Sequence, residues 1–185
     1  MCIRDRGGIP DGNRQIGDMA RSLNLPSYTV TDPRRDTANY GHARAIEFAY
    51  EHFIRDDRDV SVLLDGDMFP GKPFSIREYL DGHAMAGLEQ SRGHVYYLWP
   101  GLVFLDMARL PDRDALSFWP DAVDGVGCDV GGHSYEYLQR HPDVKVKWMD
   151  YASPITAENG NLQPLPPDNW DLWMAAARAG EGNIH

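Results

Sequence analysis

The stretch Val60-Ser61-Val62-Leu63-Leu64-Asp65-Gly66-Asp67-Met68-Phe69-Pro70 decides both the fold and the function that the sequence predicts. Its first five residues form a short apolar run, which predicts a strand buried on both faces. Asp65 and Asp67 follow where this strand ends, and Gly66 between them leaves room for a ligand to approach the backbone. Two carboxylates at this spacing can converge on one hard divalent cation. An Asp-Gly-Asp sequence is also typical of a plain turn.

The composition predicts one acidic, globular domain. The chain has 185 residues, 42% of them hydrophobic, and a net charge of -10 without a basic run, which argues against nucleic acid as a partner. An acidic protein that binds an anionic nucleotide needs a local cation, and a metal ion at Asp65 and Asp67 fits this need. Cys2 and Cys128 lie in unlike contexts, which favours a reducing compartment. Because no apolar run reaches transmembrane length and no signal peptide opens the chain, we expect a cytoplasmic protein.

Hydrophobic periodicity places further elements on both sides of the quoted stretch. Residues 1–6 match no element and resemble a translated sequencing-adapter leader, so we expect residues 7–185 to form the single domain. Residues 118–132 are expected to form a loop, and Pro70 to end further strand pairing. We expect helices over residues 14–23, 39–53, 74–80, 84–90, 134–140 and 170–178, and strands over residues 27–31, 94–99, 102–107 and 144–149.

The order strand, helix, strand, then a strand ending in Asp-x-Asp resembles glycosyltransferases of the GT-A type, in particular family 2. The resemblance covers residues 12–132. It implies an α/β fold, with a mixed sheet flanked by helices, whose first strand is missing here because it would precede Gly7. The resemblance depends most on the start of the second helix, followed about twenty residues later by Asp65-Gly66-Asp67; that helix start contains Asn39, Gly41, His42 and Ala43.

The resemblance implies a metal-dependent enzyme. Such an enzyme transfers a sugar from a nucleotide-diphosphate sugar to an acceptor, here an unknown glycan or small molecule. Mn²⁺ or Mg²⁺ would be held by Asp65 and Asp67, with His185 as a further ligand. The donor-binding residues that the resemblance implies are Asn39, Gly41, His42, Asp65 and Gly66.

An inverting enzyme also needs a carboxylate that takes the proton of the acceptor hydroxyl. Asp129, in the glycine-flanked Asp-Val-Gly-Gly stretch, is the first candidate and Asp124 is the second. Each is equally typical of an ordinary turn. The residues from Pro100 to Phe104 would shape the acceptor side, while nearby aromatic residues such as Trp119 are expected mostly in the core.

Three other functions fit parts of the pattern. A phosphohydrolase of the haloacid dehalogenase type also has an apolar strand ending in two aspartates, but Phe69 stands where such enzymes usually have Thr or Val. A sugar nucleotidyltransferase would need a glycine-rich, lysine-containing loop, which this sequence does not display. A non-catalytic carbohydrate-binding module would bind sugar without needing a metal ion.

Overall fold

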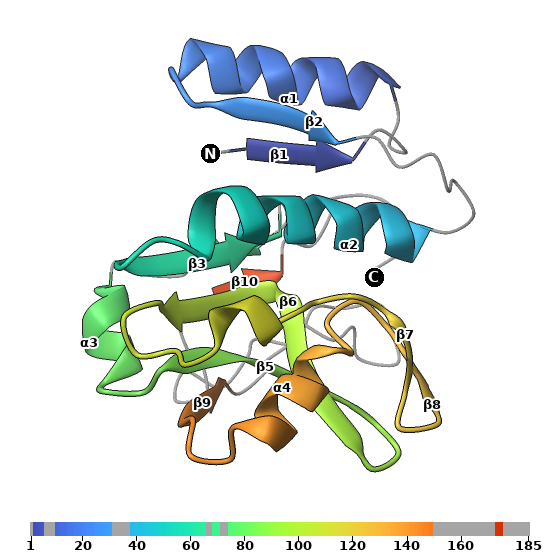
Figure 1. Ribbon diagram of the computed structural model, residues 1–185. Coiled ribbons are helices and arrows are strands. Elements are labelled where there is room, and N and C mark those ends of the chain that lie inside the picture. Colours follow the sequence, from blue (N-terminus) through green and yellow to red (C-terminus); the bar gives the residue numbers. More distant parts are fainter. Residues whose placement is uncertain are drawn as a thin grey trace, which may run out of the picture.

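The structure is a computed structural model, and it describes residues 2–5, 10–30, 38–65, 68–70, 74–149 and 173–175. It is a mixed α/β fold built around a four-stranded sheet, so the predicted fold class is confirmed at this level (Figure 1). In chain order the elements are β1 (Cys2–Asp5), α1 (Pro10–Ser22), β2 (Ser27–Val30), α2 (Ala38–Ala49), the π-helix η1 (Tyr50–Ile54), β3 (Val60–Leu64), β4 (Met68–Pro70), α3 (Ile76–Leu80), β5 (Met85–Arg92), β6 (Val95–Asp106), the 3₁₀-helix η2 (Arg113–Ala115), β7 (Asp121–Val123), β8 (Val126–Cys128), α4 (Ser134–Arg140), β9 (Val146–Met149) and β10 (Trp173–Ala175).

The main sheet has the strand order β3-β6-β5-β9. The long strand β6 runs antiparallel to both β3 and β5, and β9 runs parallel to β5 at the other edge. Side chains alternate along β6, so Val103 and Leu105 face α2 and α4, while Leu102 and Phe104 face α3. Both faces of this strand are therefore covered, and these four side chains are almost completely buried.

Strand β3 differs from its prediction. It was expected to be buried on both faces, but within the described residues it is an edge strand paired only with β6. Leu63 is buried, whereas Leu64 is 45% exposed. The prediction was wrong because an apolar Val/Leu run has the same composition in a central strand and in an edge strand.

Strand β6 was predicted as two strands separated at Pro100, and this was wrong. The structure has one strand in which the register against β5 shifts, so that Gly87 pairs with Val103 and Leu88 with Trp99. Residues 100–102 therefore have no partner in β5 and form a bulge. Proline fits there because it has no N–H to contribute to the ladder.

Four other predictions were also wrong, and in each case strand pairing explains the difference: between distant segments in the first three and within a hairpin in the fourth. Residues 84–90, expected as a helix, form β5, because pairing with β6 and β9 overrides the helix propensity of Ala, Met and Leu. Residues 1–6 were expected to form no element and the N-terminal strand to be missing, yet β1 pairs in parallel with β2. Residues 173–175, expected in a helix, form β10 against β4, so pairing continues through Pro70.

The fourth is the loop expected over residues 118–132. It contains the hairpin β7–β8, which turns at Asp124-Gly125 with φ of 48° and 77°. These positive φ values are those of a two-residue hairpin turn, for which Asp-Gly is a strong signal. The remaining predicted helices and strands are present within a few residues of their expected bounds.

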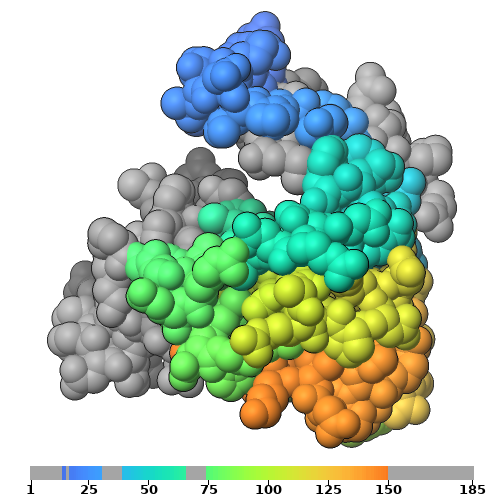
Figure 2. Space-filling model, turned by 60° about the vertical axis from the view of Figure 1, so that its left-hand side comes forward, coloured from blue at the N-terminus to red at the C-terminus, as the bar shows by residue number. Residues whose placement is uncertain are grey.

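Segment 107–118 lies between α2–η1 and α4, and Figure 2 shows it as a layer between these two parts of the molecule. The Tyr50 hydroxyl donates to the Arg113 carbonyl at 2.8 Å, and the Tyr137 hydroxyl donates to the Pro111 carbonyl at 2.7 Å. Tyr137 is the fully buried tyrosine of α4. Two buried tyrosines thus fix this segment from opposite sides.

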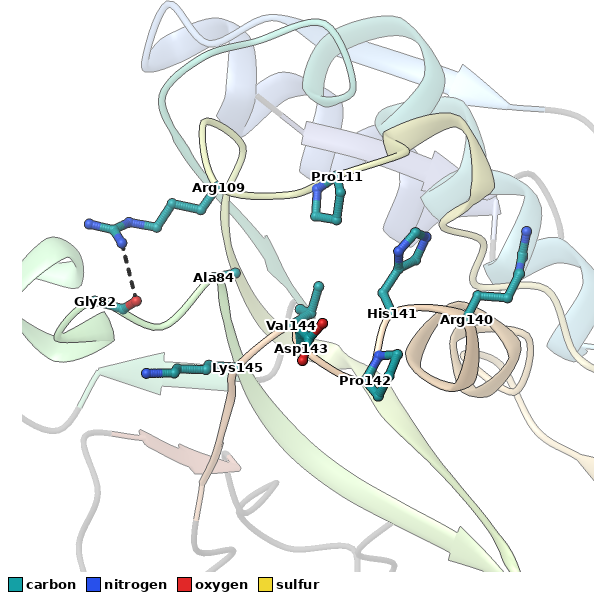
Figure 3. Close-up of a pocket in the computed structure, with 10 residues that line it drawn as sticks. All are labelled: Gly82, Ala84, Arg109, Pro111, Arg140, His141, Pro142, Asp143, Val144 and Lys145. Carbon is teal, nitrogen blue, oxygen red and sulfur yellow. Dashed lines mark hydrogen bonds between the residues drawn. The ribbon is translucent and has the colours of Figure 1, made fainter.

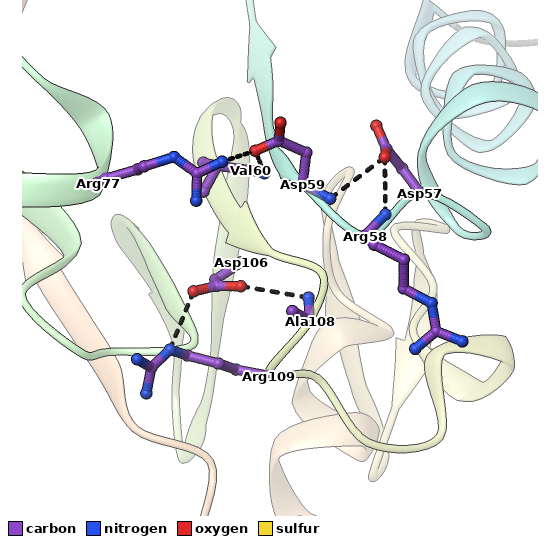
Figure 4. Close-up of polar contacts among 8 residues, drawn as sticks. All are labelled: Asp57, Arg58, Asp59, Val60, Arg77, Asp106, Ala108 and Arg109. Carbon is purple, nitrogen blue, oxygen red and sulfur yellow. Dashed lines mark hydrogen bonds and ion pairs between the residues drawn. The ribbon is translucent and has the colours of Figure 1, made fainter.

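Charged side chains fix the loop that enters β3 and the one that leaves β6 (Figure 4). Asp59, which accepts from the backbone of β3, also forms an ion pair with Arg77 of the segment containing α3. Asp106 accepts from Arg109 Nε at 3.0 Å. These contacts lie at the end of β3 opposite Asp65, so they hold the strand without occupying the candidate site. Within the described residues, no helix combines the length and apolar character that crossing a bilayer requires.

The burial of Tyr137 predicts a pH effect on stability. Burial raises the pKa of its hydroxyl from 10 to about 12. Because the unfolded chain releases this proton first, Tyr137 contributes stability that is complete below pH 10 and lost as the pH rises towards 12. We expect Tyr137→Phe to lower the free energy of unfolding by about 1 kcal/mol at neutral pH. Between pH 10 and 12, the free energy of unfolding of this variant should fall by roughly 2 kcal/mol less than that of the unsubstituted protein. Urea denaturation at several pH values measures both, and equal losses would contradict this assignment.

Candidate functional site

Asp65 and His42, two of the residues predicted to bind the donor, lie together. Asp65 directly follows β3, and His42 is in the first half of α2. The Nε2 atom of His42 is 3.1 Å from Oδ1 of Asp65, and the two side chains are 38% and 30% exposed. The Asp65 backbone N–H donates to the Gly101 carbonyl at 2.9 Å. Asp65 is therefore held by the β6 bulge while its carboxylate remains accessible to solvent.

Helix α2 presents different side chains to the two sides of the site. Ala43 and Ile46 form its buried stripe. His42, on one flank of that stripe, contacts Asp65, while Tyr40, on the other flank, donates to Asp121 at 2.5 Å. Gly41 is half-buried beside them, and Asn39 is exposed within the first turn of α2, which begins at Ala38.

The same β6 bulge also contacts the segment that contains Asp129. A Cβ atom on Gly131 would lie 2.1 Å from the Leu98 carbonyl oxygen and 2.9 Å from Pro100 Cδ. Pro100 adjoins Gly101, which binds Asp65. The bulge thus connects the end of β3 with the Asp129–Gly131 turn, and these are the two regions predicted to hold donor and catalytic base.

The two candidate bases have different surroundings. Asp129 is half-buried, and its Oδ1 accepts the N–H of Val130 at 2.8 Å, while its own N–H donates to the Tyr97 hydroxyl at 3.2 Å. Asp124 is exposed at the tip of the β7–β8 hairpin, with Oδ2 2.9 Å from Nε2 of His94. Since His94 precedes β6, Asp124 contacts the start of this strand rather than its bulge.

The donor atoms near Asp65 fit a divalent metal ion. A carboxylate is a ligand for Mg²⁺ and Mn²⁺, and imidazole also binds transition metals. The other predicted metal ligands, Asp67 and His185, and the predicted donor-binding residue Gly66 lie outside the described residues. Within the described part of the chain, no three His, Cys, Asp or Glu side chains are grouped closely enough to hold a metal ion.

Sequence reasoning missed Glu47. Its side chain lies on the buried side of α2, where the residue is only 5% exposed. It accepts hydrogen bonds from the Ser117 hydroxyl, at 3.0 Å, and from the Phe118 backbone N–H. Burial raises the pKa of this carboxyl above its ordinary value of 4.5, although both hydrogen bonds act in the opposite direction. The signal was present, because Glu47 is four residues after Ala43 and therefore on the same helix face.

A cavity lies away from Asp65 (Figure 3). It has a volume of about 500 Å³ and is lined by residues 82–84, 109–111 and 140–145 in part. Arg109 at its edge donates to the Gly82 carbonyl at 3.3 Å. The figure shows Arg109 and Lys145 pointing to one side and Arg140 pointing to the other. Because these cations do not converge on one point, we do not place an anion site there.

We compared the chain with protein-family models, with curated proteins and with solved structures, and none of them matches it.

Proposed function

We propose that this protein is a metal-dependent glycosyltransferase that uses a nucleotide-diphosphate sugar as donor. The observation that supports the proposal most is the position of Asp65, next to His42 and at the solvent-exposed end of β3. Both residues belong to the pair of segments that the GT-A resemblance implies to be donor-binding.

The order of the elements also supports the proposal. The order β1, α1, β2, α2, β3 precedes Asp65, so a strand does stand ahead of the first helix. The GT-A resemblance required strand, helix and strand before the Asp-x-Asp strand. The main sheet is mixed, with β6 antiparallel to its neighbours, as a mixed GT-A sheet would require.

The proposed chemistry assigns a task to each residue. Asp65 and Asp67 would hold Mn²⁺ or Mg²⁺, and the bound cation would stabilise the negative charge that develops on the departing nucleoside diphosphate. His42 orients the Asp65 carboxylate. Asp129, on the other side of the β6 bulge, accepts the acceptor hydroxyl proton as the oxygen attacks the sugar carbon. The β6 bulge contacts the backbone beside both carboxylates, Asp65 and Asp129, and so fixes their relative position.

A substrate panel tests the proposal. We expect UDP- or GDP-sugars to be hydrolysed or transferred only with Mn²⁺ or Mg²⁺ present, as measured by release of nucleoside diphosphate. Turnover of an aryl phosphate without nucleotide-sugar turnover would instead indicate a phosphohydrolase. Formation of a nucleotide-sugar from a nucleoside triphosphate would indicate a nucleotidyltransferase, and metal-independent sugar binding without turnover would indicate a binding module.

His42→Ala separates a role in the site from a role in stability. Because both members of the His42–Asp65 pair are about one-third exposed, their interaction contributes at most about 1 kcal/mol to folding. We expect His42→Ala to leave the free energy of unfolding within that limit, but to weaken Mn²⁺-dependent UDP binding roughly tenfold to a hundredfold, as loss of an orienting partner does.

His94→Ala is the matched control, because His94 forms a similar pair with Asp124. We expect it to leave UDP affinity unchanged. Equal UDP affinities of the His42→Ala variant and the unsubstituted protein, measured by isothermal titration, would show that His42 has no role in nucleotide binding.

A further inference from the structure

A buried carboxylate connects the helix that contacts Asp65 with the segment that contains Asp129. Glu47 is one of only two polar residues that are buried among the described residues. Both of its hydrogen-bond partners, Ser117 and Phe118, come from the segment that follows η2. The interaction thus joins two parts of the chain about seventy residues apart.

The hydrogen bonds continue from Phe118 towards Asp129. The Phe118 carbonyl accepts the N–H of Gly131 at 2.7 Å, and the Trp119 carbonyl accepts the N–H of His133 at 3.1 Å. The Trp119 ring lies 6.2 Å from the ring of Tyr40, measured between centroids. Residues 117–119 are therefore held between α2 and residues 131–133, and Glu47 provides their polar contact with α2.

A carboxylate at this position costs folding free energy. Its desolvation outweighs the two hydrogen bonds and the attraction of His133, and the neighbouring Glu51 adds repulsion. A neutral glutamine would occupy nearly the same volume at a lower desolvation cost. Costly buried charges are most often found at functional sites, so the segment that Glu47 binds through Ser117 and Phe118 is a candidate for a functional role.

We propose that Glu47 is a positioning residue, whose hydrogen bonds to Ser117 and Phe118 hold residues 117–133 on α2 and so fix the Asp129 turn relative to Asp65. Its role in sugar transfer rests on the proposed function. Helix α2 then contacts both sides of the site: His42 contacts the donor side, while Glu47 and Tyr40, which donates to Asp121, contact the acceptor side. Loss of Glu47 should loosen the acceptor side alone, because Asp65 is held by Gly101 and His42.

Hydrogen exchange on the full chain, followed by mass spectrometry, tests this proposal. We expect Glu47→Ala to increase amide exchange over residues 117–133 at least about tenfold, because the Phe118 N–H loses its acceptor. Glu47→Gln, which can still accept that bond, should remain within about twofold of the unsubstituted protein. Glu89→Gln, an exposed glutamate on β5 that is not among the groups facing Glu47, is the control and should leave exchange over residues 117–133 unchanged. Should Glu47→Ala fail to fold, Ser117→Ala provides the same test with a smaller, roughly threefold, expected increase.

The pH dependence distinguishes this role from general packing. The groups that face Glu47 are Glu51 from η1, His133 from the segment before α4, and Ser117 and Phe118. Because burial raises the Glu47 pKa, its protonation favours the closed segment, so protection factors over residues 117–133 should fall as the pH rises above 4.5 through that raised pKa. Glu47→Gln should abolish this dependence.

Binding of UDP with Mn²⁺ separates the two proposals. We expect Glu47→Ala to bind UDP within about threefold of the unsubstituted protein while its residues 117–133 exchange faster. Unchanged exchange in Glu47→Ala, or a pH dependence that persists in Glu47→Gln, would overturn the positioning role. Absence of metal-dependent UDP binding in the unsubstituted protein would instead overturn the proposed function, and with it the role of Glu47 in transfer.

Discussion

Replacement of Gly131 by alanine is expected to destabilise the protein by about 3 kcal/mol or more. Gly131 has a φ of +99°, which side-chain-bearing residues rarely adopt, and its Cβ would lie 2.1 Å from a backbone oxygen of β6. A backbone oxygen within β6 cannot move aside as a flexible side chain can. The Asp129 turn would therefore separate from the β6 bulge, or β6 would distort.

Two other glycines provide controls that separate backbone strain at positive φ from the steric clash of the added Cβ atom. Gly125 has a φ of +77° with open space around it, so Gly125→Ala measures the backbone strain alone, about 1 kcal/mol. Gly127 has neither a positive φ nor a close contact, and Gly127→Ala should be nearly neutral. Urea denaturation of the three variants gives the comparison. If Gly131→Ala lowers the free energy of unfolding no more than Gly125→Ala does, the protein does not have the close contact between Gly131 and the Leu98 carbonyl.

Asp65→Ala is expected to weaken metal-dependent binding of UDP or GDP by about a hundredfold or more, which corresponds to ~2.7 kcal/mol. The carboxylate is partly exposed and near one imidazole, so its removal takes away the proposed metal ligand without leaving a cavity in the core. For the same reason, the free energy of unfolding should change by less than about 1 kcal/mol.

Asp114→Ala is the control for this variant. Asp114 is also an exposed aspartate in an ion pair, 3.1 Å from Arg55 Nε. We expect it to bind nucleotide as the unsubstituted protein does. Equal binding by Asp65→Ala and Asp114→Ala in the presence of Mn²⁺ would show that Asp65 holds no metal ion that the nucleotide needs.

Local patterns were sufficient to predict the helices and several strands, but not the pairing of the strands. Helix α2 has a clear inward stripe, and α4 has buried residues one turn apart, so both were predicted. Strand β5 was not, because its Ala, Met and Leu residues favour a helix until β6 and β9 are placed beside it. Pro100 suggested a break because the sequence does not reveal a bulge whose partner residues lie on another strand.

The candidate site was predictable to a similar extent. His42 and Asp65 were both chosen from the sequence, and the structure brings them within 3.1 Å. Glu47 was missed because a glutamate on a helix is normally exposed, and only the later segment that supplies its two donors makes its burial possible. The metal-site predictions for Asp65, Asp67 and His185 remain predictions.

The most direct test of the account is the metal requirement of nucleotide binding. Isothermal titration of UDP and GDP should be performed on the whole chain and on Asp67→Asn, each with Mn²⁺ and again with EDTA. We predict binding by the unsubstituted protein only with Mn²⁺, and little or none by Asp67→Asn under either condition. Nucleotide binding that is equally tight in EDTA, or that is unchanged by Asp67→Asn, would contradict the claim that Asp65 and Asp67 bind a diphosphate through a shared cation.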